Sequence, residues 1–354
     1  MGFFGKKRDV FGLDLGSSAI KVVQLRSSGA GYELMGFGLV ELPPDAIREG
    51  TIREPGSVVD GIREAVKKAQ LSTKDAVLGI SGHSVITKKI RLPKVSAKEL
   101  AESILLEAEH HIPFAIDDVY MDYQVMGASG GEGGGMDVVL AVVKKAKVNE
   151  YLSVIQEADL NPVVVDVDAF ALENQFELNH PEMAEEVVAL IDMGASVMKT
   201  NVLKRGVSVF ARDIAFGGNH YTEAISQRLN LPFERAEATK RGQEGSGVHW
   251  DDLVPILESV SRELSLEVQR TFDYFASTAE AERIDRIVLS GGSAKIPGID
   301  AFLASSWGIP VEIARPFQNI QFNPQRFPAD DLYAAGPQVA IAVGLALRQP
   351  GDKR

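Results

Sequence analysis

The chain has 354 residues, no cysteine and a formal net charge of −12. This length favours two domains or one two-lobed domain, and the lack of cysteine excludes disulfides and thiolate metal sites and fits a reducing cytosol. The acidic balance argues against a broad nucleic-acid surface, because phosphate binding needs clustered lysine and arginine.

The N-terminal sequence MGFFGKKRDV lacks the apolar core of a signal peptide, and no later apolar run approaches the ~18 residues of a membrane-spanning helix. Its basic cluster of Lys6, Lys7 and Arg8 is interpreted as a solvated chain start, with a weak membrane or partner contact as the alternative.

The first half of the chain alternates strand and helix patterns. A hairpin and a third strand (GYELMGFGLVEL) come first, and DAVLGI, MDVVLAVVKK and PVVVDVD predict further strands. Apolar residues at helical spacing predict helices over 57–69, 97–111, 147–158 and 169–178.

The second half opens with another hairpin and the strand GVSVFARDI. A helix follows FGGNHYTEAI, and FERAEATKRG predicts a short one. Apolar residues from Leu253 to Phe275 advance by three or four, which predicts one buried face of a helix of about seven turns. The strand RIDRIVL then leads into SGGS, and a helix starts near Pro297.

The two hairpins are copies of each other. VFGLDLGSSAIKVVQL at 10–25 aligns without a gap with VALIDMGASVMKTNVL at 188–203, and Asp14 is matched with Asp192 at an offset of 178 residues (192 minus 14). A period of half the chain indicates two related halves rather than a solenoid. Each copy places a carboxylate at a strand end beside a turn with free N–H groups. One copy alone would favour an ordinary hairpin, whereas two favour a pair of turns that clasp a polyphosphate across a cleft.

The motifs DLGSSAIK, DMGAS, FGGNHYTEAI, AEATK and SGGS, followed by a small apolar helix, resemble the ATPase superfamily of actin, hexokinase and the heat-shock chaperones. The start FFGKK, the segment RLPKVSAKELAESILLEAEHHIPF and FGGNHYTEAI are most similar to the type IV pilus assembly protein PilM family, in the branch that also holds the cell-division protein FtsA. The resemblance covers nearly the whole chain. It implies an α/β, actin-like (ribonuclease H-like) two-lobed fold, with lobes at 1–180 and 181–354, an α+β insert at about 84–143 and a terminal helix at 335–347 that returns toward the first lobe.

The same resemblance implies ATP or ADP with Mg²⁺ between the lobes. Asp14 and Asp192 are the implied catalytic and magnesium residues, acting through metal-bound water. The implied nucleotide-binding residues are Gly16, Ser17, Ser18 and Lys21 in the first hairpin, Gly194, Ala195 and Ser196 in the second, Gly217 and Gly218 near the β-phosphate, Glu237 and Lys240 beside the ribose and adenine, and Gly291, Gly292 and Ser293 below the adenosine.

Several of these residues have a purely structural alternative. Lys21 is either a phosphate ligand or a solvated strand lysine, and Glu237 with Lys240 is either a nucleotide contact or an exposed i,i+3 helix pair. For Lys199, the match of Lys21 in the second hairpin, a strand lysine is favoured. A P-loop is excluded because G-x-x-x-x-G-K-[ST] is absent.

By the resemblance, the chain is expected to be a cytoplasmic ATP-binding adaptor of the type IV pilus inner-membrane platform, serving pilus assembly and twitching motility with at most slow ATPase activity. The cleft between insert and first lobe would take the cytoplasmic N-terminal peptide of PilN. Other pilus platform or motor proteins and a second copy of the chain are further candidate partners. The sequence ends in LRQPGDKR without the amphipathic helix of FtsA, so membrane contact is expected to be indirect.

Two alternatives stay open. The first is an FtsA-like filament or membrane-scaffold protein. The second is a sugar or metabolite kinase of the same superfamily, which would need a general-base aspartate facing a sugar site. Asp166 and Asp168, at a buried-looking strand and helix start, do not stand out as that base.

Overall fold

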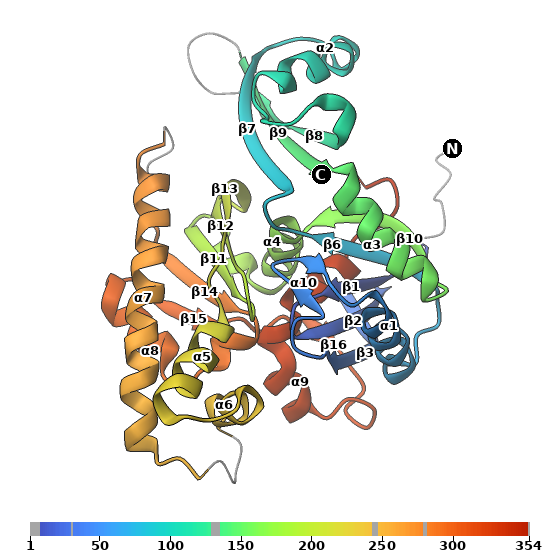
Figure 1. The fold of residues 1–354 in the computed structure, drawn as a ribbon. Helices are drawn as coiled ribbons and strands as arrows, with labels where there is room; N and C mark the ends of the chain where they lie inside the picture. The colour runs from blue at the N-terminus through green and yellow to red at the C-terminus, as the bar shows by residue number, and fades with distance from the viewer. Residues whose placement is uncertain (1–7, 30, 129–134, 243–246, 279–281, 353–354) are drawn as a thin grey trace.

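The computed structural model describes residues 8–29, 31–128, 135–242, 247–278 and 282–352. It consists of two large lobes, each with its own β-sheet, and a small third unit above the first lobe (Figure 1). Lys6 and Lys7 of the basic cluster lie outside the described residues. Arg8 is described, and its guanidinium makes an ion pair of 2.5 Å with Asp75 rather than remaining purely solvated.

The first lobe is built on a six-stranded sheet in the order β10-β6-β1-β2-β3-β16. The strands are β1 (Phe11–Leu15), β2 (Ala19–Ser28), β3 (Gly31–Glu41), β6 (Asp75–Ile80), β10 (Asn161–Val167) and β16 (Ile320–Gln321). Apolar side chains of α1 (Pro55–Ala69) and α3 (Lys145–Glu157) share one core with β1, β2 and β6. The strand β16 comes from the second half of the sequence and pairs with β3, so the chain returns to the first lobe near its C-terminus.

The second lobe repeats this plan with a five-stranded sheet in the order β13-β12-β11-β14-β15. Its strands are β11 (Val187–Met193), β12 (Met198–Lys204), β13 (Val207–Ile214), β14 (Arg286–Ser290) and β15 (Val311–Ile313). Its helices are α5 (Gly218–Leu229), α6 (Phe233–Lys240), α7 (Trp250–Ala276) and α8 (Ile299–Trp307). The helix α7 has 27 residues and buries the predicted apolar positions from Leu253 to Phe275, which confirms the seven-turn prediction.

The duplication is confirmed in the strand register. In the first lobe β1 pairs antiparallel with β2 and parallel with β6, and Asp14 lies opposite Lys21. In the second lobe β11 pairs antiparallel with β12 and parallel with β14, and Asp192 lies opposite Lys199. The gapless sequence alignment therefore corresponds to the same hairpin geometry in both lobes.

The insert is a three-stranded sheet covered by one helix. The strand order is β7-β9-β8, from β7 (Val85–Pro93), β8 (Val119–Ala128) and β9 (Gly135–Lys144). The helix α2 (Ala97–Glu109) packs Leu100 and Ile104 on the sheet, and a capping box of Ser96 and Glu99 fixes its start. A 3₁₀ turn (Ile116–Asp118) precedes β8.

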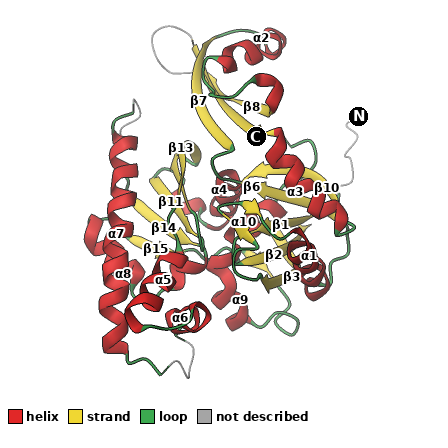
Figure 2. Cartoon of the chain, viewed as in Figure 1, coloured by secondary structure: helices red, strands yellow, loops and turns green. Residues whose placement is uncertain are grey.

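The two lobes meet at a pair of central helices, α4 (Asp168–Asn179) and α10 (Ala340–Ala346) (Figure 2). Their contact is close because Gly344 has no side chain: a Cβ there would lie 1.7 Å from the carbonyl oxygen of Ala171. The terminal helix expected over 335–347 is interrupted. The helix α9 (Ala329–Ala335) ends, a 3₁₀ turn (Gly336–Val339) follows, and α10 begins, because Pro337 cannot donate a helical hydrogen bond.

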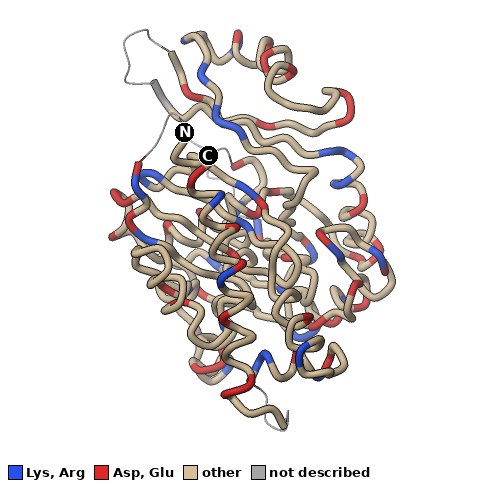
Figure 3. The backbone as a smooth tube through the Cα atoms, turned by 60° about the vertical axis from the view of Figure 1, so that its left-hand side comes forward, with Lys and Arg blue, Asp and Glu red and all other residues tan. Residues whose placement is uncertain are grey.

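The remaining elements are short. A two-stranded hairpin of β4 (Ile47–Arg48) and β5 (Thr51–Ile52) follows β3, and 3₁₀ turns occur at Pro181–Met183 and Gly292–Lys295. Acidic and basic residues are interspersed along the chain (Figure 3), and several form ion pairs between elements, such as Arg286 with Glu186 at 3.0 Å. Among the described residues no helix is both long and apolar enough to cross a membrane.

Candidate functional site

The two hairpins bring their carboxylates and lysines into buried pairs. Asp14 is the penultimate residue of β1, and its Oδ2 lies 3.0 Å from Nζ of Lys21, whose side chain is only 13% exposed. The solvated-lysine interpretation of Lys21 is therefore wrong. Lys21 also lies over the first turn, since a Cβ on Gly16 would come within 2.5 Å of its Nζ.

Lys199 has a more central position than the sequence indicated. Its Nζ lies 3.5 Å from Oδ2 of Asp192 and 3.4 Å from Oδ2 of Asp168, at the start of α4. Burial acts to lower the pKa of Lys199, but the surrounding carboxylates, Asp168 first, outweigh it and raise that pKa. Burial raises the pKa of the Asp168 carboxyl to about 6. Lys199 thus joins carboxylates from both halves of the chain and is not an ordinary strand lysine.

The turns of the two hairpins touch. The hydroxyl oxygens of Ser17 and Ser196 are 2.5 Å apart. Within the described residues, the backbone amides of Ser17, Ser18, Ala195 and Ser196 donate to no protein acceptor, whereas those of Gly16 and Gly194 close their own turns. Four unused amides on two facing turns are a donor set that suits the oxygens of a phosphate chain.

The glycines before α5 support the second turn. The amide of Gly218 donates to the carbonyl of Gly194 at 2.9 Å, and that of Asn219 donates to Ala195 at 2.8 Å. A Cβ on Gly217 would lie 2.6 Å or less from both of these carbonyl oxygens. The amides at the start of α5 are therefore used to hold the turn in place.

The SGGS segment lies behind the same turn. Gly291 has a φ of +86°, and a Cβ there would lie 2.4 Å from the Met193 carbonyl oxygen, so the position needs glycine. Ser293 donates its hydroxyl to the carbonyl of Gly194 at 3.0 Å. The residues Gly291, Gly292 and Ser293 are not part of the cavity wall described below.

Glu237 and Lys240 form a buried pair that links α6 to α5. The Nζ of Lys240 donates to Glu237 at 2.5 Å, to the hydroxyl of Thr222 at 2.9 Å and to the carbonyl of Gly218 at 3.1 Å. Burial lowers the pKa of Lys240, and for Glu237 the nearby Lys240 outweighs burial and lowers the carboxyl pKa. The exposed-pair interpretation is wrong, because only 8% of the Lys240 side chain is exposed.

A cavity of about 840 Å³ lies in front of these groups, between the lobes. Five predicted site residues line it: Ser17, Ser18, Ala195, Ser196 and Glu237. The other predicted residues are not in its wall, and most of them lie behind the two turns or brace α5. The size falls within the range of pockets that hold small ligands and cofactors.

Sequence analysis missed other residues of the cavity wall. The most notable is Arg241, which pairs with Glu41 of the first lobe and donates to Glu237 at 2.9 Å, so it bridges the mouth of the cavity. Arg48, Glu49, Asn219 and Glu223 also line the wall. Asn219 and Glu223 belong to the motif FGGNHYTEAI, in which only the two glycines were predicted as site residues. Arg48, Glu49 and Arg241 belong to none of the motifs, and an isolated charged residue in a loop or helix gives no sequence signal of its position across a cleft.

The part of the chain that the structure describes contains no group of three histidine, aspartate or glutamate residues that could hold a metal ion by itself. Asp14 and Asp192 are each engaged by a lysine. The carboxylates of Asp14 and Asp192 therefore do not fit direct coordination of a metal ion by protein groups alone. They do fit a magnesium ion that is carried by phosphate oxygens and reached through water.

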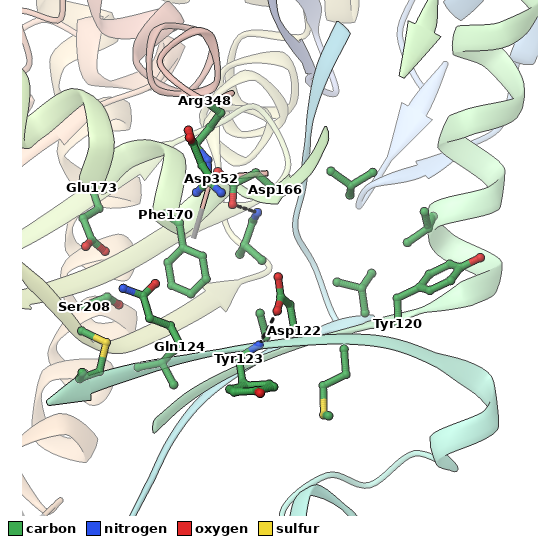
Figure 4. Close-up of a pocket in the computed structure, with 18 of the residues that line it drawn as sticks. Tyr120, Asp122, Tyr123, Gln124, Asp166, Phe170, Glu173, Ser208, Arg348 and Asp352 are labelled. Atoms are coloured by element: carbon green, nitrogen blue, oxygen red, sulfur yellow. Dashed lines mark hydrogen bonds and ion pairs between the residues drawn. The ribbon is translucent and has the colours of Figure 1, made fainter. Parts of the chain in front are cut away.

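A second hollow, the groove between the insert and the two lobes, has a volume of about 410 Å³ (Figure 4). Its wall is mainly apolar and comes from β8, β9, α3, β10, α4, β13 and the residues after α10. Phe170 of α4 and Gln124 of β8 lie on its walls, and an ion pair of 3.2 Å between Arg348 and Asp166 closes one side. Because β8 and β10 are edge strands, the groove is bordered by two sheet edges and suits an extended segment.

Comparison with known proteins gives a consistent assignment. A family model described as type IV pilus assembly protein PilM matches residues 12–350. A solved PilM–PilN type IV pilus biogenesis complex contains a chain with 29% identity and a TM-score of 0.85, over 97% of this chain and 99% of that one. MreB5 of Spiroplasma citri bound to AMPPNP has 13% identity and a TM-score of 0.56, with coverage of 96% and 95%. The fold is therefore actin-like, with a duplicated sheet and an α+β insert.

Curated relatives match less of their own length. The cell-division protein FtsA of Helicobacter pylori is 24% identical over 330 residues, which is 84% of this chain and 62% of that protein. The ethanolamine utilization protein EutJ of Salmonella typhimurium is 24% identical over 140 residues, which is 38% of this chain and 46% of that protein. The chain thus spans less than two thirds of the length of these curated relatives.

Proposed function

The chain belongs to the type IV pilus assembly protein PilM family, and we propose that it binds ATP between its lobes and the cytoplasmic N-terminal peptide of PilN in the groove. This proposal rests mainly on two separate hollows of suitable size and chemistry, one beside the edge strand β10 and the insert, the other at the β1–β2 turn and the segment after β3. The lobes in this proposal are residues 1–180 and 181–354, with the insert at about 84–143.

Several features support nucleotide binding in the cavity. The four unused turn amides offer donors to phosphate oxygens, and Lys21 adds a positive charge beside the first turn. Asp14 and Asp192 would hold Mg²⁺ through water, and the ion would neutralise phosphate charge. Since the wall also carries carboxylates such as Glu41 and Glu237, we expect binding to depend on the divalent ion.

The groove supports the peptide part of the proposal. Its wall is mainly apolar, and its two sheet edges offer backbone groups to an extended segment. The related complex that contains PilN covers nearly the whole of this chain. Attachment to the inner membrane would then run through the partner, and the protein itself would be cytoplasmic.

Nucleotide state would act on the groove by changing the angle between the lobes, because the second lobe contributes Val207 and Ser208 to the groove wall. Hydrolysis would be slow, since the carboxylates that could orient water are engaged by Lys21 and Lys199. Other pilus proteins, which would bind according to this nucleotide state, would drive pilus assembly and twitching motility.

The deciding experiment is a calorimetric titration with a synthetic PilN N-terminal peptide, with and without Mg-ATP. Phe170→Asp should abolish peptide binding and leave ATP binding intact, because it adds a charge to the apolar groove alone. Ala195→Glu should weaken Mg-ATP binding at least about tenfold and leave the peptide affinity in the absence of nucleotide unchanged, because it repels phosphate. Each variant is thus the control for the other. Absence of peptide binding to the unmodified protein in both conditions would overturn the proposal.

A further inference from the structure

The helix α3 lines the groove with some of its residues and, with others, contacts the β4–β5 hairpin, which lines the cavity. Val148 and Leu152 are four residues apart and line the groove. Lys147, Glu150 and Tyr151 contact the β4–β5 hairpin. Adjacent residues of a helix are rotated by about 100°, so the two sets lie on neighbouring sectors of a single rigid element, and these sectors meet at Val148 and Tyr151.

The contacts with the hairpin converge on one carbonyl. The oxygen of Gly50 accepts hydrogen bonds from Nζ of Lys147 and, at 2.7 Å, from the hydroxyl of Tyr151. Glu150 accepts from the amide of Ile52 at 2.7 Å and pairs with Lys147 at 3.2 Å. The ammonium of Lys147 also lies 4.2 Å from the centre of the Tyr151 ring. One turn of α3 therefore holds the backbone of the hairpin turn at Gly50 and of the following strand at Ile52.

These contacts involve buried side chains, so breaking them costs free energy. Lys147 is 9% exposed and Tyr151 is 4% exposed. An ammonium group loses free energy on burial unless its hydrogen bonds are satisfied, so displacement of the Gly50 carbonyl from Lys147 would be costly. A movement of α3 is thus expected to carry the hairpin with it.

Other residues of the hairpin line the cavity. Arg48 and Glu49 are both part of the cavity wall. The turn has positive φ at both central residues, +49° at Glu49 and +76° at Gly50. Such turns favour asparagine or glycine at the first position, and glutamate there is strained. The strain is retained at a residue that lines the cavity, which is typical of a functional position.

We infer that Lys147 and Tyr151 are positioning residues that couple the occupancy of the groove to the occupancy of the cavity. A peptide packed on Val148 and Leu152 biases the position of α3, and the Gly50 carbonyl transmits that bias to Arg48 and Glu49. A nucleotide that contacts these two residues biases α3 in the reverse direction, because thermodynamic coupling is reciprocal. This inference rests on the proposed function, since it takes the peptide and the nucleotide as the two ligands.

The test measures the dissociation constant of the synthetic PilN peptide with and without saturating Mg-AMPPNP. For the unmodified protein we expect the two constants to differ by about fivefold or more. Tyr151→Phe removes only the hydroxyl that donates to Gly50, and Lys147→Met removes the ammonium but keeps an unbranched side chain. Each substitution should bring the ratio of the two dissociation constants closer to one. The affinity for the peptide alone and for the nucleotide alone should change little. A purely structural role would not change that ratio selectively.

The chain offers matched controls. Tyr333→Phe changes a tyrosine that is 57% exposed on α9, and Lys67→Met changes an exposed lysine on α1. Both should leave the ratio unchanged. If Lys147→Met does not fold, Tyr151→Phe decides the outcome, because it deletes a single oxygen.

The outcomes separate the inference from the proposed function. Binding of both ligands with a ratio of one in the unmodified protein, or a ratio that Tyr151→Phe leaves unchanged, overturns the inference and leaves the proposed function standing. Failure of the unmodified protein to bind either ligand overturns the proposed function and the inference with it. A reduced ratio in both variants and an unchanged ratio in both controls supports the inference.

Discussion

The hydroxyl groups of Ser17 and Ser196 lie 2.5 Å apart, although 179 residues separate them in the sequence. Each belongs to the turn of one of the duplicated hairpins, so this contact closes the space between the two turns. A phosphate chain that uses the amides of both turns would have to replace it. On the proposed function, we therefore expect this contact to separate when nucleotide binds, and its separation would measure that binding.

The separation can be measured with a disulfide. The chain has no cysteine, so a Ser17→Cys/Ser196→Cys variant contains a single pair. We expect mild oxidation to join the pair within one chain, because its side-chain atoms start close together. Mg-AMPPNP should slow this reaction about tenfold or more, in line with a ligand that shifts a two-state equilibrium. Mobility on a non-reducing gel reports the rate, and an equal rate with nucleotide would contradict the prediction.

The buried pair of Lys240 and Glu237 should be important for stability. We expect Lys240→Met to lower the free energy of unfolding by about 1–3 kcal/mol, because it removes the ammonium that donates to Glu237 and to the Gly218 carbonyl. Urea denaturation measures the change. The exposed Lys67→Met variant is the control and should change the free energy by less than about 0.5 kcal/mol.

The same pair predicts that the stability of the folded state falls at acidic pH. The folded-state pKa of Glu237 is lowered, so its contribution to stability is present above its unfolded pKa of about 4.5 and is lost as the pH falls through the lower folded value. Lys240→Met should remove part of this acid-induced loss. Measurements of the free energy of unfolding between pH 2 and pH 6 test this prediction. The same loss of stability with acid in the unmodified protein and in Lys240→Met would contradict it.

Asp168 should give a pH dependence of stability that is opposite to that of Glu237. Burial raises its pKa from 3.8 to about 6, so between these values the folded state binds the proton more tightly than the unfolded state. Stability attributable to this carboxyl should therefore fall as the pH rises through about 4 to 6. Asp168→Asn should flatten that part of the profile. Denaturation midpoints at several pH values measure it, and an unchanged slope would show that Asp168 does not titrate there.

Close helix packing at Gly344 gives a fifth prediction. Gly344→Ala should lower the free energy of unfolding by at least about 1–3 kcal/mol, because the added methyl group would overlap the Ala171 carbonyl and push α10 away from α4. Gly56→Ala is the control, since a Cβ there meets nothing within 4 Å and alanine favours the helix. Thermal unfolding compares the two variants, and equal midpoints would contradict the packing argument.

The sequence by itself determined the features that leave a local or repeated pattern. The hairpin copies at Asp14 and Asp192 and the long apolar face of α7 follow from strand and helix periodicity and from a gapless alignment, and the structure confirms all three. These features depend on residues close together in the chain, or on the repetition of one pattern. The order of the motifs along the chain also predicts the family, and the family model over residues 12–350 confirms it.

Only the tertiary structure decided how distant residues meet. Lys199 between Asp168 and Asp192, Arg241 against Glu41, and the Lys147 contact with Gly50 each join separate segments. The groove is assembled from six elements and the residues after α10. A single charged or apolar residue has no periodicity, so its sequence neighbours do not show whether it ends on the surface or in a buried pair. That outcome depends on how the packed sheets and helices bring separate segments of the chain together.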